Sequence, residues 1–211
     1  MTERRQRLHA WFGAAFPTGA FAYSHGLEAA IAAGTVADAG ALADWIGAVL
    51  AQGAGRSDAV LLTAAMRPGA DLDALADLAA ALATSRERWV ETVEQGRAFA
   101  AVSASVWGTE AEPRPLPIAV GAAAGALGDG PEDVVALYLH AMAANLVSVA
   151  VRFLPLGQTA GQRVLAGLYP VIEATAAAAL QADPDDLGGA TLAADLAAMR
   201  HETMPVRIFR T

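Results

Sequence analysis

Apolar residues recur along this chain with the spacing of amphipathic helices. The clearest case follows Asp38 and places apolar residues at i, i+3, i+4, i+7 and i+8, namely Leu42, Trp45, Ile46, Val49 and Leu50. This spacing covers one face of a helix, and Asp38 is a favourable N-cap. Alternating apolar and polar positions, which are typical of strands, never extend beyond a few residues. The pattern therefore predicts an all-α protein.

Further helices are predicted over most of the chain, separated by prolines and glycines that interrupt helical hydrogen bonding. The predicted ranges are 57–67, 72–83, 86–107, 117–127, 131–153, 158–180 and 192–201. The helix at 158–180 is expected to bend at Pro170. A chain of 211 residues is long enough for one sizeable core. We therefore predict a single-domain bundle of roughly eight to ten helices over residues 1–211, with a flexible carboxyl-terminal tail at about 203–211.

Hydrophobic residues make up 55% of the chain, so a membrane protein has to be considered. The longest uncharged stretch, residues 134–151, just reaches the length of a membrane-spanning helix but contains His140, Asn145 and Ser148. A central bundle helix can be equally apolar. The amino terminus has no apolar segment of signal-peptide length. We therefore expect a cytoplasmic protein without a membrane partner, and keep a membrane-associated helical component as an alternative.

Two residue types are missing from the chain, and their absence removes several kinds of chemistry. There is no cysteine, which excludes disulfides and cysteine-based zinc or iron–sulfur sites. Every basic residue is arginine, so Schiff-base chemistry and a Walker-A phosphate loop are excluded as well. The net charge of −8 argues against nucleic-acid binding. An acidic excess suits solubility and protein partners.

The stretch "FPTGAFAYSHGLEAAIAAG", residues 16–34, concentrates glycines and aromatic residues. Pro17 and Gly19 predict a turn, and a helix is expected from about residue 21 to Gly34, a natural left-handed stop. Gly26 could admit a neighbouring backbone closely. Three apolar residues are expected to pack in the core: Phe21, Leu27 and Ile31.

The polar residues of the same stretch can be considered as catalytic or metal-binding groups. Ser24 and His25 would point to opposite sides of a helix and cannot act together as nucleophile and base. His25 and Glu28 could share a helix face, as metal ligands or as a hydrogen-bonded pair. Two ligands do not hold a metal, and the remaining histidines lack ligand spacing: His9, His140 and His201. We expect no stably bound metal or cofactor and no catalytic residues, and keep an enzyme with an unrecognised site as an alternative.

Four segments resemble one known family. "PTGAFAYSHGLEAAIAAG" resembles the amino-terminal signature P-x-G-x-F-x-[YH]-S-x-G-L-E of the urease accessory protein UreF family. "EQGRAF" at 94–99, "AVRFLPLGQTAGQRVL" at 150–165 and "MRHETMPVRIFRT" at 199–211 resemble the other conserved segments of that family, in the same order. Together the four segments span nearly the whole chain.

The resemblance implies an all-α adaptor without enzymatic activity of its own. UreF-type proteins bind UreD, also called UreH, and the two recruit the nickel-carrying GTPase UreG. The assembly delivers nickel to the urease apoprotein, and UreF is proposed to modulate GTP hydrolysis. A route for nickel through UreF and UreD has also been proposed for the family. We expect a homodimer that binds no cofactor stably, with nickel handled by the complex.

Three segments are candidates for partner binding, because arginines and aromatic residues are common interface anchors. They comprise Arg207, Ile208, Phe209, Arg210 and Thr211 in the tail, Tyr23, Ser24 and Glu28 in the signature, and Pro155, Gly157 and Gln158 in a turn. The residues expected to shape the structure are Pro17, Gly19, Phe21, Gly26, Leu27 and Gly96. The tail is expected to dock on UreD and to shape the surface for UreG. A frayed terminus, ordinary packing and a plain helix junction are the respective alternatives.

Overall fold

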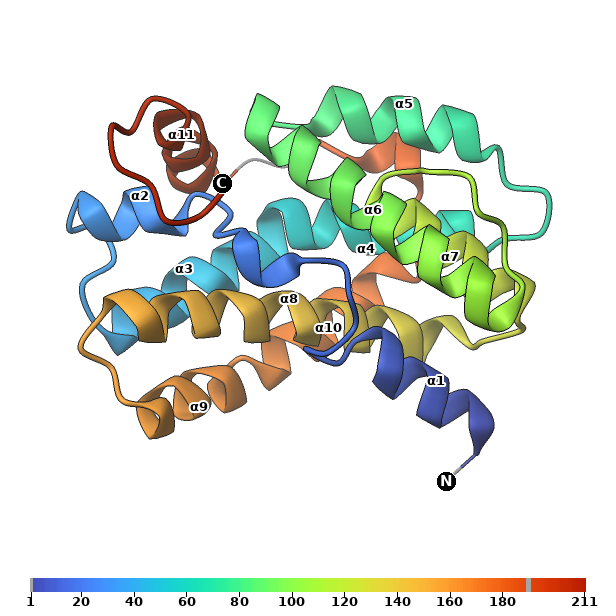
Figure 1. Cartoon of the computed structure of the whole chain (residues 1–211), viewed down its shortest axis with the longest axis horizontal. Helices are drawn as coiled ribbons and strands as arrows, with labels where there is room; N and C mark the ends of the chain where they lie inside the picture. The colour runs from blue at the N-terminus through green and yellow to red at the C-terminus, as the bar shows by residue number, and fades with distance from the viewer. Residues whose placement is uncertain (1, 189–190) are drawn as a thin grey trace.

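Helices provide all the regular secondary structure in residues 2–188 and 191–211, the part of the chain that the computed structural model describes (Figure 1). The α-helices are α1 (Glu3–Trp11), α2 (Leu27–Ala32), α3 (Ala39–Gln52), α4 (Ala54–Ala65), α5 (Leu72–Leu82), α6 (Arg86–Trp107), α7 (Leu116–Ala126), α8 (Pro131–Phe153), α9 (Gln158–Gly167), α10 (Tyr169–Ala179) and α11 (Leu192–His201). Nine of these described helices have ten or more residues. The predicted all-α bundle of roughly eight to ten helices is confirmed.

Several helix ends lie where the sequence predicts them, because their caps are local. The carboxylate of Asp38 accepts from Ala41 N at 2.9 Å at the start of α3, and that of Asp71 accepts from Ala74 N at 3.0 Å at the start of α5. One boundary prediction is wrong. The range 158–180 forms two helices that meet at Leu168, so the break precedes Pro170, which lies in the first turn of α10, where no amide is needed.

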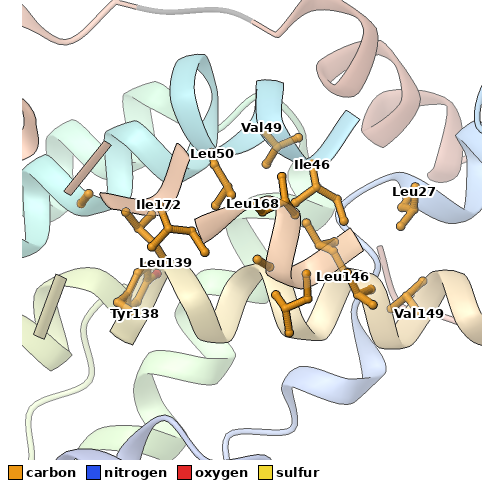
Figure 2. Packing of buried hydrophobic residues seen from close by; sticks show 14 of the residues in the cluster. Leu27, Ile46, Val49, Leu50, Tyr138, Leu139, Leu146, Val149, Leu168 and Ile172 are labelled. Atoms are coloured by element: carbon orange, nitrogen blue, oxygen red, sulfur yellow. The ribbon is translucent and has the colours of Figure 1, made fainter. Parts of the chain in front are cut away.

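The hydrophobic core is built around α8, which runs through the middle of the bundle and packs against α2, α3, α4, α9 and α10 (Figure 1). Figure 2 shows how its side chains meet those of the surrounding helices. The labelled core residues are Leu27 of α2, Ile46, Val49 and Leu50 of α3, Tyr138, Leu139, Leu146 and Val149 of α8, Leu168 at the α9–α10 junction and Ile172 of α10.

Among the described residues, α8 is long and apolar enough to cross a membrane by length and composition alone. Half of its most apolar stretch is buried inside the bundle. A central helix of a folded core meets the same criteria, and the position of α8 in the core accounts for its composition.

The long helix α6 is held against the segment that leads into α7. A β-carbon on Gly96 would come within 1.9 Å of the carbonyl oxygen of Arg114, so only glycine permits this approach. Thr92 of α6 accepts a hydrogen bond from the amide of Leu116 at 3.2 Å, one turn before Gly96. This packing fixes the position of α6, which carries the carboxylates described next.

Candidate protein-interaction site

The tail folds back from the end of α11 onto the signature segment (Figure 1). Arg210 N donates to the carbonyl oxygen of Ala22 at 2.8 Å, and Ser24 N donates to that of Thr211 at 2.9 Å. The hydroxyl of Ser24 donates to the same carbonyl oxygen of Thr211. Two of the three segments assigned to partner binding therefore lie side by side, although they stand at opposite ends of the sequence.

The signature segment does not form the helix expected from residue 21. Residues Ala20–Ala22 form a 3₁₀ turn, and α2 begins only at Leu27. The reason is that His25 and Gly26 both adopt left-handed backbone conformations, with φ of 57° and 76°. A β-carbon on Gly26 would lie 2.5 Å from the backbone nitrogen of Ala198 in α11. This close approach is the one expected of Gly26.

The interrupted helix changes which side chains of the signature are buried. Phe21 is 65% exposed, so its predicted place in the core is wrong. The helical spacing that grouped it with Leu27 does not hold across the two left-handed residues. Leu27 is fully buried and Ile31 partly buried, because both lie within α2. Pro17 is exposed, and Gly19 is left-handed with φ of 74° at the start of the turn.

Glu28 is the centre of the contact between tail and bundle. Its carboxylate is on a side chain that is 5% exposed; it accepts from the amides of Ile208 and Phe209, both at 2.9 Å, and contacts Nε2 of His201 at 3.1 Å. Burial raises the pKa of Glu28, but the hydrogen bonds from Phe209, His201 and Ile208 outweigh it and leave this pKa below its usual value. His25 lies outside α2, so the expected shared face with Glu28 is not formed.

One face of α6 presents three carboxylates to the tail and the signature, because Glu87, Glu91 and Glu94 are spaced four and three residues apart. Glu87 contacts His201 Nδ1 at 2.6 Å and an Arg207 guanidinium nitrogen at 2.5 Å. Glu91 contacts His25 Nδ1 at 2.8 Å and Thr211 Oγ1 at 2.7 Å, and it also pairs with the guanidinium of Arg88 in its own helix. Glu94 contacts the Tyr23 hydroxyl at 2.5 Å and an Arg210 guanidinium nitrogen at 2.6 Å. The tail is thus held through charge-assisted hydrogen bonds along about two turns of α6.

Two residues of the tail are buried, and the residues before them are exposed. Phe209 is 5% exposed and its ring centroid lies 5.4 Å from that of Phe153 at the end of α8. Thr211 is fully buried, whereas Val206 and Ile208 are 76% and 73% exposed. Of the five tail residues assigned to partner binding, Ile208 alone presents a large apolar side chain to solvent.

The third candidate segment lies at the same end of α8. Pro155, Gly157 and Gln158 are all exposed in the turn between α8 and α9. This turn follows Phe153 directly, so it begins next to the buried ring of Phe209. The structure therefore brings the signature and the tail into contact, and leaves the turn beside them.

Sequence reasoning missed the exposed apolar face of α11. Leu192, Leu196 and Met199 are exposed at i, i+4 and i+7, a spacing that places them on one face of the helix. The buried side of α11 consists of the small residues Ala194, Ala197 and Ala198, followed by His201 at the end of the helix. The signal in the sequence was this division, with alanines on one side and large apolar residues on the other. Large exposed apolar residues mark interaction surfaces.

A polar contact in the core was also missed. Asp58 of α4 is partly buried and accepts from the hydroxyl of the buried Tyr138 at 2.7 Å; desolvation raises the pKa of both side chains. Both line a cavity of about 330 Å³, together with Trp11, Phe99 and His25. The signal available was a carboxylate directly before the apolar run of residues 59–62 in α4, but only the fold shows what it faces.

Within residues 2–188 and 191–211, no group of three or more histidine, aspartate or glutamate side chains is arranged to hold a metal ion. The polar residues around the tail are instead engaged with one another. Exposed apolar side chains on and just before a tail that is held in place are features typical of protein-interaction surfaces.

Comparison with known proteins identifies the family. A model of the UreF family matches residues 36–169. The chain is 61% identical over 201 residues to the urease accessory protein UreF of Cereibacter sphaeroides strain KD131, covering 95% of each chain. It is 53% identical over 207 residues to that of Paracoccus denitrificans strain Pd 1222, covering 98% of this chain and 96% of the relative. It is 51% identical over 205 residues to the urease accessory protein UreF of Jannaschia sp. strain CCS1, covering 97% of this chain and 93% of the relative.

The chain therefore belongs to the UreF family of urease accessory proteins, and the resemblance found in its four segments is confirmed. The names of the relatives describe an accessory rather than a catalytic role in urease production.

Proposed function

We propose that this chain is a non-catalytic adaptor in urease maturation. It joins UreD (UreH) and the GTPase UreG on the urease apoprotein for GTP-dependent insertion of nickel, and modulates the GTPase. Nickel is the cargo of the complex and not a stably bound cofactor of this chain. The adaptor acts in the cytoplasm as a homodimer, without nucleic acid or membrane. Family membership supports the accessory role, and the site described above supports binding to a protein partner.

The observation that carries this proposal is the set of exposed apolar side chains on and just before the tail. Leu196 and Met199 of α11 are followed by Val206 and Ile208, all exposed. Arg207 and Arg210 already pair with carboxylates of α6, so the contact offered to UreD is mainly apolar. A tail held by its own chain loses less conformational entropy on binding than a disordered one.

Co-purification with UreD and UreG tests the proposal, using size-exclusion chromatography with light scattering and activation of urease as readouts. Deleting residues 207–211 would also remove the buried Phe209 and Thr211, so it would not separate docking from folding. The sharper variant is Val206→Asp/Ile208→Asp, which changes two side chains that are exposed in the free chain. The matched control is Val106→Asp, an apolar residue of α6 that is 60% exposed.

We expect the double variant to keep its helicity and melting temperature but to lose the complex and urease activation, while the control keeps both. A double variant that assembles and activates urease normally would place the interface elsewhere. If the wild-type chain itself fails to assemble with UreD and UreG, the adaptor function is wrong.

A further inference from the structure

His201 lies fully buried between two carboxylates that come from different helices. Its Nε2 is 3.1 Å from Oε2 of Glu28 in α2, and its Nδ1 is 2.6 Å from Oε2 of Glu87 in α6. The imidazole side chain has no solvent exposure, and those of Glu28 and Glu87 are 5% and 17% exposed. Both ring nitrogens are therefore engaged with carboxylates and neither is engaged with solvent.

Counting protons shows what this arrangement requires. An ionised carboxylate only accepts hydrogen bonds, and a neutral imidazole has one N–H donor and one lone pair. Two hydrogen bonds among Glu28, His201 and Glu87 therefore need two protons: one is the proton of the neutral ring, and the second sits on the other ring nitrogen or on a carboxyl oxygen. If the second proton leaves, a lone pair of nitrogen faces a carboxylate oxygen in a buried place, and that contact is lost.

The two carboxylates also hold the tail. Glu28 accepts from the amides of Ile208 and Phe209, and Glu87 pairs with Arg207. The remaining charged group is Glu202, next to His201, whose carboxylate accepts from the amide of Glu87 at 3.2 Å. The contacts of His201 thus connect α2, α6 and α11 with the same carboxylates that position residues 207–209.

We propose that His201 is a positioning residue whose contacts with Glu28 and Glu87 form a proton-dependent clasp, the Glu28–His201–Glu87 cluster, that holds the tail in place. With both protons present, the clasp is closed, and Val206 and Ile208 are held exposed. When the second proton passes to solvent as the pH rises, one contact breaks and the tail detaches. The consequence for partner binding rests on the proposed adaptor function, whereas the clasp itself is a property of the isolated chain.

Amide exchange measured by NMR on the full-length, ¹⁵N-labelled chain tests the clasp without any partner. From neutral to alkaline pH, and after correction for the intrinsic pH dependence of exchange, we expect the protection of the Ile208 and Phe209 amides to fall by about tenfold or more, the loss expected from one charge-assisted hydrogen bond. The amide of Ala143 in the core of α8 should keep its protection. Ring ¹⁵N resonances of His201 followed over the same range should change together with the tail amides.

Two matched variants separate the clasp from a general loss of charge on α6. In Glu87→Gln, the amide can turn either its oxygen or its NH₂ group toward Nδ1, so the contact survives in both protonation states and the alkaline loss of protection should disappear. Glu94→Gln removes the negative charge from a different contact of the tail, that with Arg210, and should leave the alkaline loss unchanged. Both variants change exposed or partly exposed side chains, so the fold is expected to persist.

Tail protection that does not change with pH in the wild type would overturn the proposal. The same holds if Glu87→Gln retains the alkaline loss, or if the ring of His201 titrates while the tail amides remain protected. None of these measurements involves UreD or UreG, so failure of the clasp is distinguishable from failure of the adaptor function.

Discussion

Gly26 is the residue at which the backbone of the signature meets α11, and Gly26→Ala tests how much this contact contributes. An alanine there would have to adopt φ near 76°, and its β-carbon would lie 2.5 Å from Ala198 N and 2.8 Å from Ala198 Cα. The left-handed conformation costs about 1–2 kcal/mol for a residue with a β-carbon. The clash is with the backbone of α11, which must move, and overpacking of this kind costs about 1–3 kcal/mol. We therefore expect the free energy of unfolding to fall by about 2–5 kcal/mol.

Gly34 provides the control, because its φ of 72° is almost the same and nothing lies within 4 Å of the place that a β-carbon would occupy. Gly34→Ala should cost only the conformational term, about 1–2 kcal/mol. Urea denaturation measures both values, and for a protein of this size each kcal/mol corresponds to roughly 2–4 °C in melting temperature. Displacement of α11 should also reduce protection of the Ile208 and Phe209 amides in Gly26→Ala but not in Gly34→Ala. Equal losses of stability in the two variants would refute the inferred contact between Gly26 and α11.

Three further predictions concern buried contacts of this site and the neighbouring core. Burial raises the pKa of Glu91, but the nearby Arg88 guanidinium and the His25 side chain together outweigh it and lower this pKa to about 2. Because this folded-state pKa lies below the unfolded one, ionised Glu91 stabilises the fold above about pH 4.5, and this stabilisation is lost as pH falls toward 2. In Glu91→Gln, the free energy of unfolding should therefore change less with pH over that range. Tyr138→Phe removes the donor to the partly buried Asp58 and should lower the free energy of unfolding by about 1–3 kcal/mol, measured by urea denaturation, and an unchanged value would contradict this contact. Phe209→Ala removes a buried ring and should release the tail, seen as rapid exchange of its amides while the core amides stay protected; a tail that remains protected would show that the charged contacts suffice.

The helices could be predicted because their determinants are local. Asp38 and Asp71 cap α3 and α5 through amides three residues away, and Pro131 begins α8 at the predicted residue. Predictions failed where a backbone conformation departed from the helical spacing. His25 adopts a left-handed conformation although it is not glycine, and this moved Phe21 from the expected core to the surface.

The candidate site was predicted as segments but not as an arrangement. The signature and the tail were both singled out, yet His201 looks isolated in the sequence because nothing near it along the chain is a partner. Its partners are Glu28, 173 residues away, and Glu87, 114 residues away. Periodicity relates residues within a few turns and says nothing about which helices meet.

The sequence by itself determined the all-α class, most helix ends and membership of the UreF family, since caps, periodicity and short motifs are properties of neighbouring residues. Only the tertiary structure decided which of the motif residues are buried and which are exposed. It also brought Glu28 and Glu87 into contact with His201, where the two carboxylates hold the tail. These depend on the close approach of α2 to α11 at Gly26 and on the position of α6, and such approaches are set by packing across the whole chain.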